Sequence, residues 1–121
     1  MSRIRAIHHV NVGIRDRERT RQWYQKVFDA EVKPHPRMLQ LYLGASEIHC
    51  PETPNPTYLK TNHFAVEVAD WEGMMAHLAT LDIPFDDGIG PQTRDYDGHR
   101  FAYIRDPDGN LIELVHYPAT G

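Results

Sequence analysis

The sequence predicts an α+β fold built from two similar modules, each with one strand, one helix and about three further strands. Two observations lead to this prediction. The alternating segment and the helical stripe that begin the chain start again after residue 60, and the second half ends with a strand, a tight turn and another strand. Amphipathic helices beside alternating strands are typical of helices packed on one face of a sheet.

The first module is expected over about residues 5–52. Residues 6–14 alternate between apolar and polar side chains, which predicts a strand. Asp16 is the expected cap of a helix over residues 17–29, where apolar side chains recur every three or four positions. Further strands are expected over residues 31–35, 38–43 and 47–50. Prolines at positions 51, 54 and 56 then mark a linker.

The second module, over about residues 60–118, repeats this pattern. His63 and Asp70 follow His9 and Asp16 by the same 54 positions, which indicates an internal duplication. A strand is expected over residues 62–68, and Asp70 caps a helix with an apolar stripe. Residues 86–98 are expected to form a long mobile loop. The segments 100–105 and 110–117 form a predicted hairpin, because the sequence between them is Asp-Pro-Asp-Gly.

Composition limits the classes of protein to which the chain can belong. It has 121 residues, of which 40% are hydrophobic and 25% charged, so a single globular domain over residues 1–121 is expected. The net charge of −4 and the scattered lysines and arginines disfavour nucleic acid as a partner. The single cysteine, Cys50, excludes an internal disulfide and favours the reducing cytoplasm. No stretch approaches transmembrane length, so no membrane partner is expected.

Three side chains point to metal chemistry. His9 and His63 lie on the strand faces opposite to the apolar residues, and two duplicated strands related by a pseudo-twofold axis would direct both imidazoles toward one cavity. Glu113 interrupts the apolar run 111–115, where a carboxylate is costly to bury unless it is paired or binds a cation. Two imidazoles and one carboxylate suit Fe, Mn, Zn or Ni. The sequence therefore predicts a divalent metal ion bound by His9, His63 and Glu113.

The resemblance to a known family rests on three segments: IHHVNV at 7–12, NHFAVEV at 62–68 and YIRDPDGNLIEL at 103–114. Together they resemble the vicinal oxygen chelate superfamily, which includes glyoxalases, bleomycin-resistance proteins and extradiol dioxygenases. The resemblance covers nearly the whole chain. It implies two βαβββ modules, whose strands curl into an eight-stranded cup with the helices outside. It also implies an enzyme, because members that bind drugs without chemistry usually lack the three metal ligands.

Two further residues, His49 and Tyr103, are the candidate catalytic residues. His49, or a position beside it, is the counterpart of Glu113 in the first module, and three roles fit it: a side chain away from the ion, a hydrogen-bond donor to a ligand, or a fourth ligand. The resemblance implies that glyoxalase I has a glutamate at the position of His49, where it acts as a metal ligand and as a base. The histidine in this chain therefore disfavours glyoxalase I activity. Tyr103 matches a tyrosine that contacts substrate in fosfomycin-modifying members, and it is equally suited to the hairpin core.

The expected function is that of a metal-dependent enzyme whose small, oxygen-bearing substrate chelates the metal. Extradiol-type dioxygenase is the leading named reaction, because two histidines and a carboxylate suit Fe(II) oxygen chemistry. A glyoxalase-like lyase or isomerase is the second reading, and a drug-binding protein like the bleomycin-resistance proteins is the third. A homodimer is expected from the resemblance and because short strands leave edges that a partner can cover. By resemblance, fosfomycin transferases have a threonine two residues after the first histidine, and this chain has Asn11 there. This difference disfavours fosfomycin transfer as the reaction.

The remaining candidate residues, an arginine, a tyrosine and several histidines, have less specific interpretations. Arg94, Tyr96 and His99 lie in the loop before the last hairpin, for which three roles are open: a solvated loop, which is favoured, a lid, or contact with an anionic substrate. Four other histidines have no spacing that distinguishes them, and we interpret them as surface or packing residues: His8, His35, His77 and His116.

Overall fold

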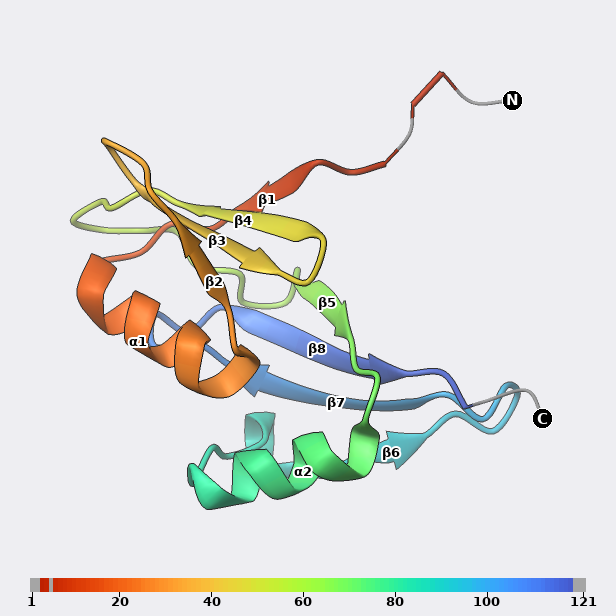
Figure 1. Cartoon of the computed structure of the whole chain (residues 1–121). Coiled ribbons are helices and arrows are strands. Elements are labelled where there is room, and N and C mark those ends of the chain that lie inside the picture. The colour runs from red at the N-terminus through yellow and green to blue at the C-terminus, as the bar shows by residue number, and fades with distance from the viewer. Residues whose placement is uncertain (1–2, 5, 119–121) are drawn as a thin grey trace. The chain divides into compact units, whose positions relative to one another are not determined.

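The structure is a computed structural model that describes residues 3–4 and 6–118, so the predicted start of the first module at residue 5 lies outside the described residues. The chain divides between Tyr58 and Leu59 into two compact units (Figure 1). Each unit has its own four-stranded mixed sheet and one long helix, which confirms the α+β class and the two βαβββ modules. In the part of the chain that is described, no helix has the length and apolar character needed to cross a membrane.

The first unit contains five elements in the predicted order. They are β1 (His9–Asn11), α1 (Arg17–Phe28), β2 (Glu31–Lys33), β3 (Leu39–Leu43) and β4 (Ser46–Cys50). The sheet order is β1-β4-β3-β2, with β1 parallel to β4 and the other pairs antiparallel. The Asp16 side chain accepts a hydrogen bond from Arg19 N and caps α1, as predicted. β1 and β2 are shorter than the alternating sequence indicates.

The sheet of the first unit has one buried face and one polar face. In β4, Ile48 and Cys50 are buried, whereas Glu47 and His49 alternate with them on the opposite side. The buried face contributes to a core with the apolar stripe of α1, whose Tyr24 and Val27 are buried. Each apolar side chain buried in this way contributes about 1.5–3 kcal/mol, so the core fixes the register and thereby sets which side chains share the polar face.

The second unit contains β5 (Phe64–Glu67), α2 (Trp71–Thr80), the short 3₁₀ helix η1 (Asp86–Gly88), β6 (Gln92–Thr93), β7 (Arg100–Arg105) and β8 (Leu111–His116). The sheet order is β5-β8-β7-β6, with β5 parallel to β8. Asp70 caps α2 by accepting from Gly73 N, as predicted. The predicted long loop over residues 86–98 is wrong, because this segment contains η1 and β6. Arg105 Nε donates to Asp86 at 2.7 Å and holds η1 beside β7.

The turn between β7 and β8 is built around a buried carboxylate. Asp106 Oδ1 accepts hydrogen bonds from the backbone N–H groups of Asp108 and Asn110, both at 2.9 Å. The Asn110 side chain in turn accepts from Leu59 N at 2.7 Å, and Leu111 N donates to Leu59 O at 2.8 Å. Arg105 donates to the carbonyl groups of Leu59 and Lys60. The turn therefore anchors the segment that enters the second unit just before His63.

Candidate functional site

The strand registers give His49 the same place in the first sheet that Glu113 has in the second. Asn11, two positions after His9, pairs with His49. Ala65, two positions after His63, pairs with Glu113. Because paired residues share a face of the sheet, His9 and His49 lie on one face of the first sheet, and His63 and Glu113 on one face of the second.

In the second unit, His63 and Glu113 contact each other directly although 50 residues separate them. The distance from His63 Nε2 to Glu113 Oε1 is 3.0 Å. The Glu113 side chain is only 17% exposed, so its charge is partly removed from water and needs this partner. The parallel pairing of β5 with β8 produces the contact.

A second contact orients the ring of His63. Its Nδ1 lies 3.2 Å from the carbonyl oxygen of Thr61, which only accepts hydrogen bonds. With Nδ1 directed at this carbonyl group, Nε2 is directed at the Glu113 carboxylate. The two facing atoms, Nε2 and Oε1, are of the kinds that can share a hydrogen or bind a cation together.

Tyr103 completes the polar group of the second unit. It pairs with Glu113 across β7 and β8, and its ring meets the His63 ring edge-on at 5.4 Å between centroids. Burial raises the pKa of Tyr103, and the charge of Glu113 and a hydrogen bond to its carboxylate raise it further. The phenol is therefore protonated at neutral pH, and it donates its hydrogen bond to the carboxylate.

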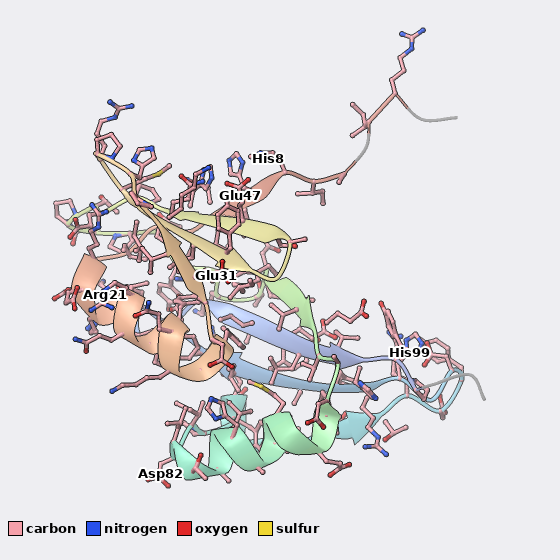
Figure 2. All side chains as sticks on the ribbon, viewed as in Figure 1. His8, Arg21, Glu31, Glu47, Asp82 and His99 are labelled. Atoms are coloured by element: carbon pink, nitrogen blue, oxygen red, sulfur yellow. The ribbon has the colours of Figure 1, made fainter. Side chains whose placement is uncertain are left out.

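The first unit gathers a second polar group around Glu47. The rings of His9 and His49 are stacked with centroids 3.8 Å apart and planes 15° apart. His8 Nε2 lies 3.1 Å from Glu47 Oε2, and His49 Nε2 lies 3.4 Å from Glu47 Oε1. Figure 2 shows His8 and Glu47 close to each other. His8 and His9 also approach each other through their Nδ1 atoms at 3.0 Å. The carboxylate of Glu47 therefore lies between two imidazoles that flank the predicted ligand His9.

The surroundings of Glu47 favour its charged form. Desolvation acts to raise the pKa of Glu47, but the hydrogen bonds from His49 and Gln40, together with the charge of His8, outweigh it and lower the pKa. Gln40 Nε2 donates to Glu47 Oε1, and the Gln40 side chain is largely buried. Glu47 is thus a charged acceptor that can orient both imidazoles.

The sequence did not indicate His8 and Glu47 as members of this group. His8 precedes β1, so strand alternation gives it no side of the sheet. Glu47 lies two positions before His49, and this spacing was the available signal, because residues i and i+2 of a strand share a face. Two of the histidines interpreted as surface or packing residues make polar contacts with the backbone: His35 Nδ1 accepts from Arg37 N, and His116 Nδ1 contacts Val68 O at 2.7 Å.

Neither unit by itself groups three metal-ligating side chains. Within the first unit and within the second, the described residues contain no set of three His, Cys, Asp or Glu side chains that could hold a metal ion. The second unit supplies two adjacent donors, His63 and Glu113.

The chain is similar in fold to several solved structures. One is a protein from Bacillus anthracis described as a glyoxalase family member, with a TM-score of 0.84 and 24% identity, covering 98% of this chain and 99% of that one. The fosfomycin resistance protein FosX from Listeria monocytogenes has a TM-score of 0.79 and 19% identity, covering 95% of both chains. Lactoylglutathione lyase from Agrobacterium tumefaciens has a TM-score of 0.77 and 18% identity, covering 95% and 96%. At these identities the likeness concerns the fold.

The family membership of the chain is shown by a sequence match and not by these structures. A family model described as the Glyoxalase/Bleomycin resistance protein/Dioxygenase superfamily matches residues 6–114, which is most of the chain. The match includes both strand pairs that carry His9, His49, His63 and Glu113. The chain therefore belongs to the glyoxalase, bleomycin resistance protein and dioxygenase superfamily.

Proposed function

We propose that this protein is a metal-dependent enzyme, with His63 and Glu113 as two ligands of one divalent ion and His9 as the third. Its substrate is a small molecule that presents oxygen atoms to the ion. One observation carries the proposal: His63 Nε2 faces Glu113 Oε1 at 3.0 Å while Thr61 O holds His63 Nδ1.

The geometry of this pair fits a metal ion. Imidazole and carboxylate ligands lie about 2.0–2.2 Å from Zn, so two ligands in adjacent positions are separated by about 3 Å. Histidine ligands also donate their second N–H to a carbonyl or carboxylate, which fixes the ring. The contact of His63 Nδ1 with Thr61 O, at 3.2 Å, supplies this interaction.

The third ligand is proposed to come from the first unit, either of this chain or of a second copy in a homodimer. Two observations support His9. It follows the same duplicated pattern as His63, and the described residues of the second unit offer no third His, Cys, Asp or Glu side chain that completes a metal-binding group with His63 and Glu113. His49, stacked on His9 and next to Glu47, is proposed to position His9 rather than to ligate.

When bound, the ion supplies open positions for substrate oxygens and stabilises negative charge that develops on them. The protein groups around it then bind, orient and move protons. Tyr103 keeps its proton at neutral pH and can donate it to a substrate oxygen beside Glu113. His49, whose Nε2 faces Glu47, can accept a proton from a substrate or donate one through its other ring nitrogen, Nδ1. Tyr103 and His49 are therefore the proposed catalytic residues.

Extradiol-type dioxygenase is the leading reaction within this proposal. Two histidines and one carboxylate form a ligand set that suits non-haem Fe(II) and leaves open positions for a catechol and for oxygen. A glyoxalase-like lyase or isomerase is the second candidate. His49 stands at the place that corresponds to Glu113, where glyoxalase I is expected to have a glutamate, so this candidate needs an imidazole rather than a carboxylate as its base and ranks second.

Metal content tests the proposed site. The protein is loaded separately with Fe(II), Mn(II), Zn(II) and Ni(II), passed through a desalting column and measured by mass spectrometry. We expect one ion per chain, lost in both His63→Ala and Glu113→Gln. His77→Ala on α2 is the matched control and should keep the ion. Full occupancy in both site variants would refute the assignment.

Oxygen consumption separates the two reactions. Fe(II)-loaded protein should take up oxygen with catechols if it cleaves rings, whereas a lyase should convert the thiohemiacetal formed from an α-oxoaldehyde and a thiol without oxygen. A drug-binding protein like those that give bleomycin resistance would do neither, and it would bind its ligand equally well after chelation.

A further inference from the structure

The polar face of the second sheet extends beyond the candidate metal ligands to a second group of charged residues. On β7, Tyr103 pairs with Glu113 and Phe101 pairs with Val115. Gln92 of β6 pairs with Phe101, so it lies on the same face. The ladder continues past β6, because Arg94 N donates to His99 O and Gly98 N donates to Arg94 O, both at 2.8 Å.

Alternation along these strands places Arg94 and His99 on the face that carries Tyr103 and Glu113. His99 is two residues before Phe101 and four before Tyr103 on the same chain segment. Roughly 13 Å of strand separates the Tyr103 row from the His99 row. Figure 2 shows His99 at the end of the sheet where the chain turns between β6 and β7. Phe101 and Val115, both partly buried, lie between the two polar ends.

The guanidinium of Arg94 is held in one orientation. Its Nε and Nη2 donate to the two carboxylate oxygens of Asp97, at 3.2 and 2.7 Å, and Nη2 also contacts the His99 ring. Its carbon Cζ lies 5.2 Å from the centre of the Tyr96 ring. Among the described residues, no hydrogen bond is made by Nη1. Arg94 therefore has one edge fixed by Asp97 and one edge available for a ligand.

Arg94 lies on the same face of the sheet as Glu113, at the other end. The hydrogen bond to Asp97 raises the pKa of Arg94 despite desolvation, and the charge of Glu113 contributes to the same shift. A ligand that contacts both ends of this face would have to span roughly 13 Å along the strands.

We propose that Arg94 binds an anionic oxygen group of the substrate, a carboxylate or a phosphoryl group. The inference rests on the proposed function, which assigns the other end of the substrate: its oxygen atoms are held near His63 and Glu113. The second sheet then recognises a molecule with two polar ends and an apolar middle that packs on Phe101 and Val115. This selects small dianionic or oxygen-rich acids over neutral molecules of the same length.

The first experiment tests the anion site without a metal. Chelated, isotope-labelled protein is titrated with methylphosphonate, and the amide signals of residues 94–99 are followed by NMR. We expect saturable shifts in the native protein and at least a tenfold weaker dissociation constant in Arg94→Gln, since a hydrogen bond to a charged group is lost. Arg100→Gln is the matched control, because Arg100 is on the opposite face and pairs with Glu72. Unshifted native signals, or equal losses in both variants, would overturn the proposal.

The second experiment tests the two-ended substrate. Zn(II)-loaded protein is titrated with adipate, which has a carboxylate at each end, and with hexanoate, which has one carboxylate and the same length. Adipate should bind at least ten times more tightly, and Arg94→Gln should remove this preference. An adipate preference that persists in Arg94→Gln contradicts the inference. Metal content is measured separately, and the methylphosphonate titration uses no metal, so failure of the metal site and failure of the anion site give different results.

Discussion

His49 occupies in the first sheet the position that Glu113 occupies in the second, but the two side chains have different partners. Glu113 is a partly buried carboxylate that contacts His63 Nε2 at 3.0 Å. His49 is stacked on His9 with 3.8 Å between ring centres, and its Nε2 faces Glu47. The duplication has therefore placed an anion in one sheet and an imidazole with its own carboxylate partner in the other.

Replacing His49 should weaken metal binding without abolishing it. His49→Ala removes the ring on which His9 stacks, and loss of a group that orients a ligand costs about 10–100-fold in metal affinity. Competition with a chromophoric chelator gives the dissociation constant. His8→Ala is the control, because this more exposed side chain also contacts His9 and Glu47, and it should change affinity less than His49→Ala. Complete loss of the ion in His49→Ala would instead make His49 a ligand.

Replacing Tyr103 should separate stability from metal binding. Tyr103→Phe keeps the ring that meets His63 edge-on but removes the hydroxyl group that donates to Glu113. We expect a loss of about 1 kcal/mol in the free energy of unfolding, measured by urea denaturation of the chelated protein. Metal content should remain at one ion per chain. A variant that no longer binds metal would show that the phenol itself is needed to hold the site.

Asp97 should titrate below its ordinary range. Burial acts to raise the pKa of Asp97, but the hydrogen bonds from His99 N and Arg94 and the charge of Arg94 outweigh it, so the pKa lies below 3.8. Because the folded-state pKa is depressed, the stability that Asp97 contributes is present above about pH 4 and is lost as the pH falls through the lower folded value. Carboxyl carbon NMR measures this directly. In Arg94→Gln the pKa of Asp97 should move back toward 3.8, and an unchanged value would contradict the ion pair.

The buried turn should be far more sensitive to substitution than the exposed loop before it. Asp106→Ala removes the acceptor of two backbone N–H groups and of the Asn110 side chain. Leaving buried donors without a partner should cost about 3 kcal/mol or more. Asp95→Ala, in an exposed position of the loop, is the comparison and should change stability by less than about 0.5 kcal/mol. Equal effects in urea denaturation would refute this role of Asp106.

Much of the fold could be predicted because its signals are local. Asp16 and Asp70 cap the helices at the expected positions, and residues 100–105 form the expected strand. The two-residue strand β6 was missed because so short a segment has no measurable periodicity; its pairing with Phe101 and Arg100 defines it. β1 is also shorter than predicted, because the last predicted residue, Ile14, forms only an isolated bridge to Glu52.

The candidate site was predictable in part for the same reason. The duplication shows that His63 stands at the position equivalent to His9. The apolar residues around Glu113 indicate a carboxylate that is costly to bury unless it has a partner. The contact between His63 and Glu113 depends on the parallel register of β5 and β8, which the repeat only implies. The group around Glu47 depends on where β1 begins, and side-chain alternation cannot determine the side on which His8 lies. The proposed ligand role of His9 stays a prediction.

The anchoring of Leu59 by the turn between β7 and β8 has a mechanical consequence. Asn110, Leu111 and Arg105 hold the backbone of residues 59 and 60, immediately before the strand that positions His63. These contacts join residues 59 and 60 to the same unit that holds His63 and Glu113. We therefore expect the distance between His63 Nε2 and Glu113 Oε1 to depend on the β7–β8 turn more than on the proline-containing connection that precedes Leu59.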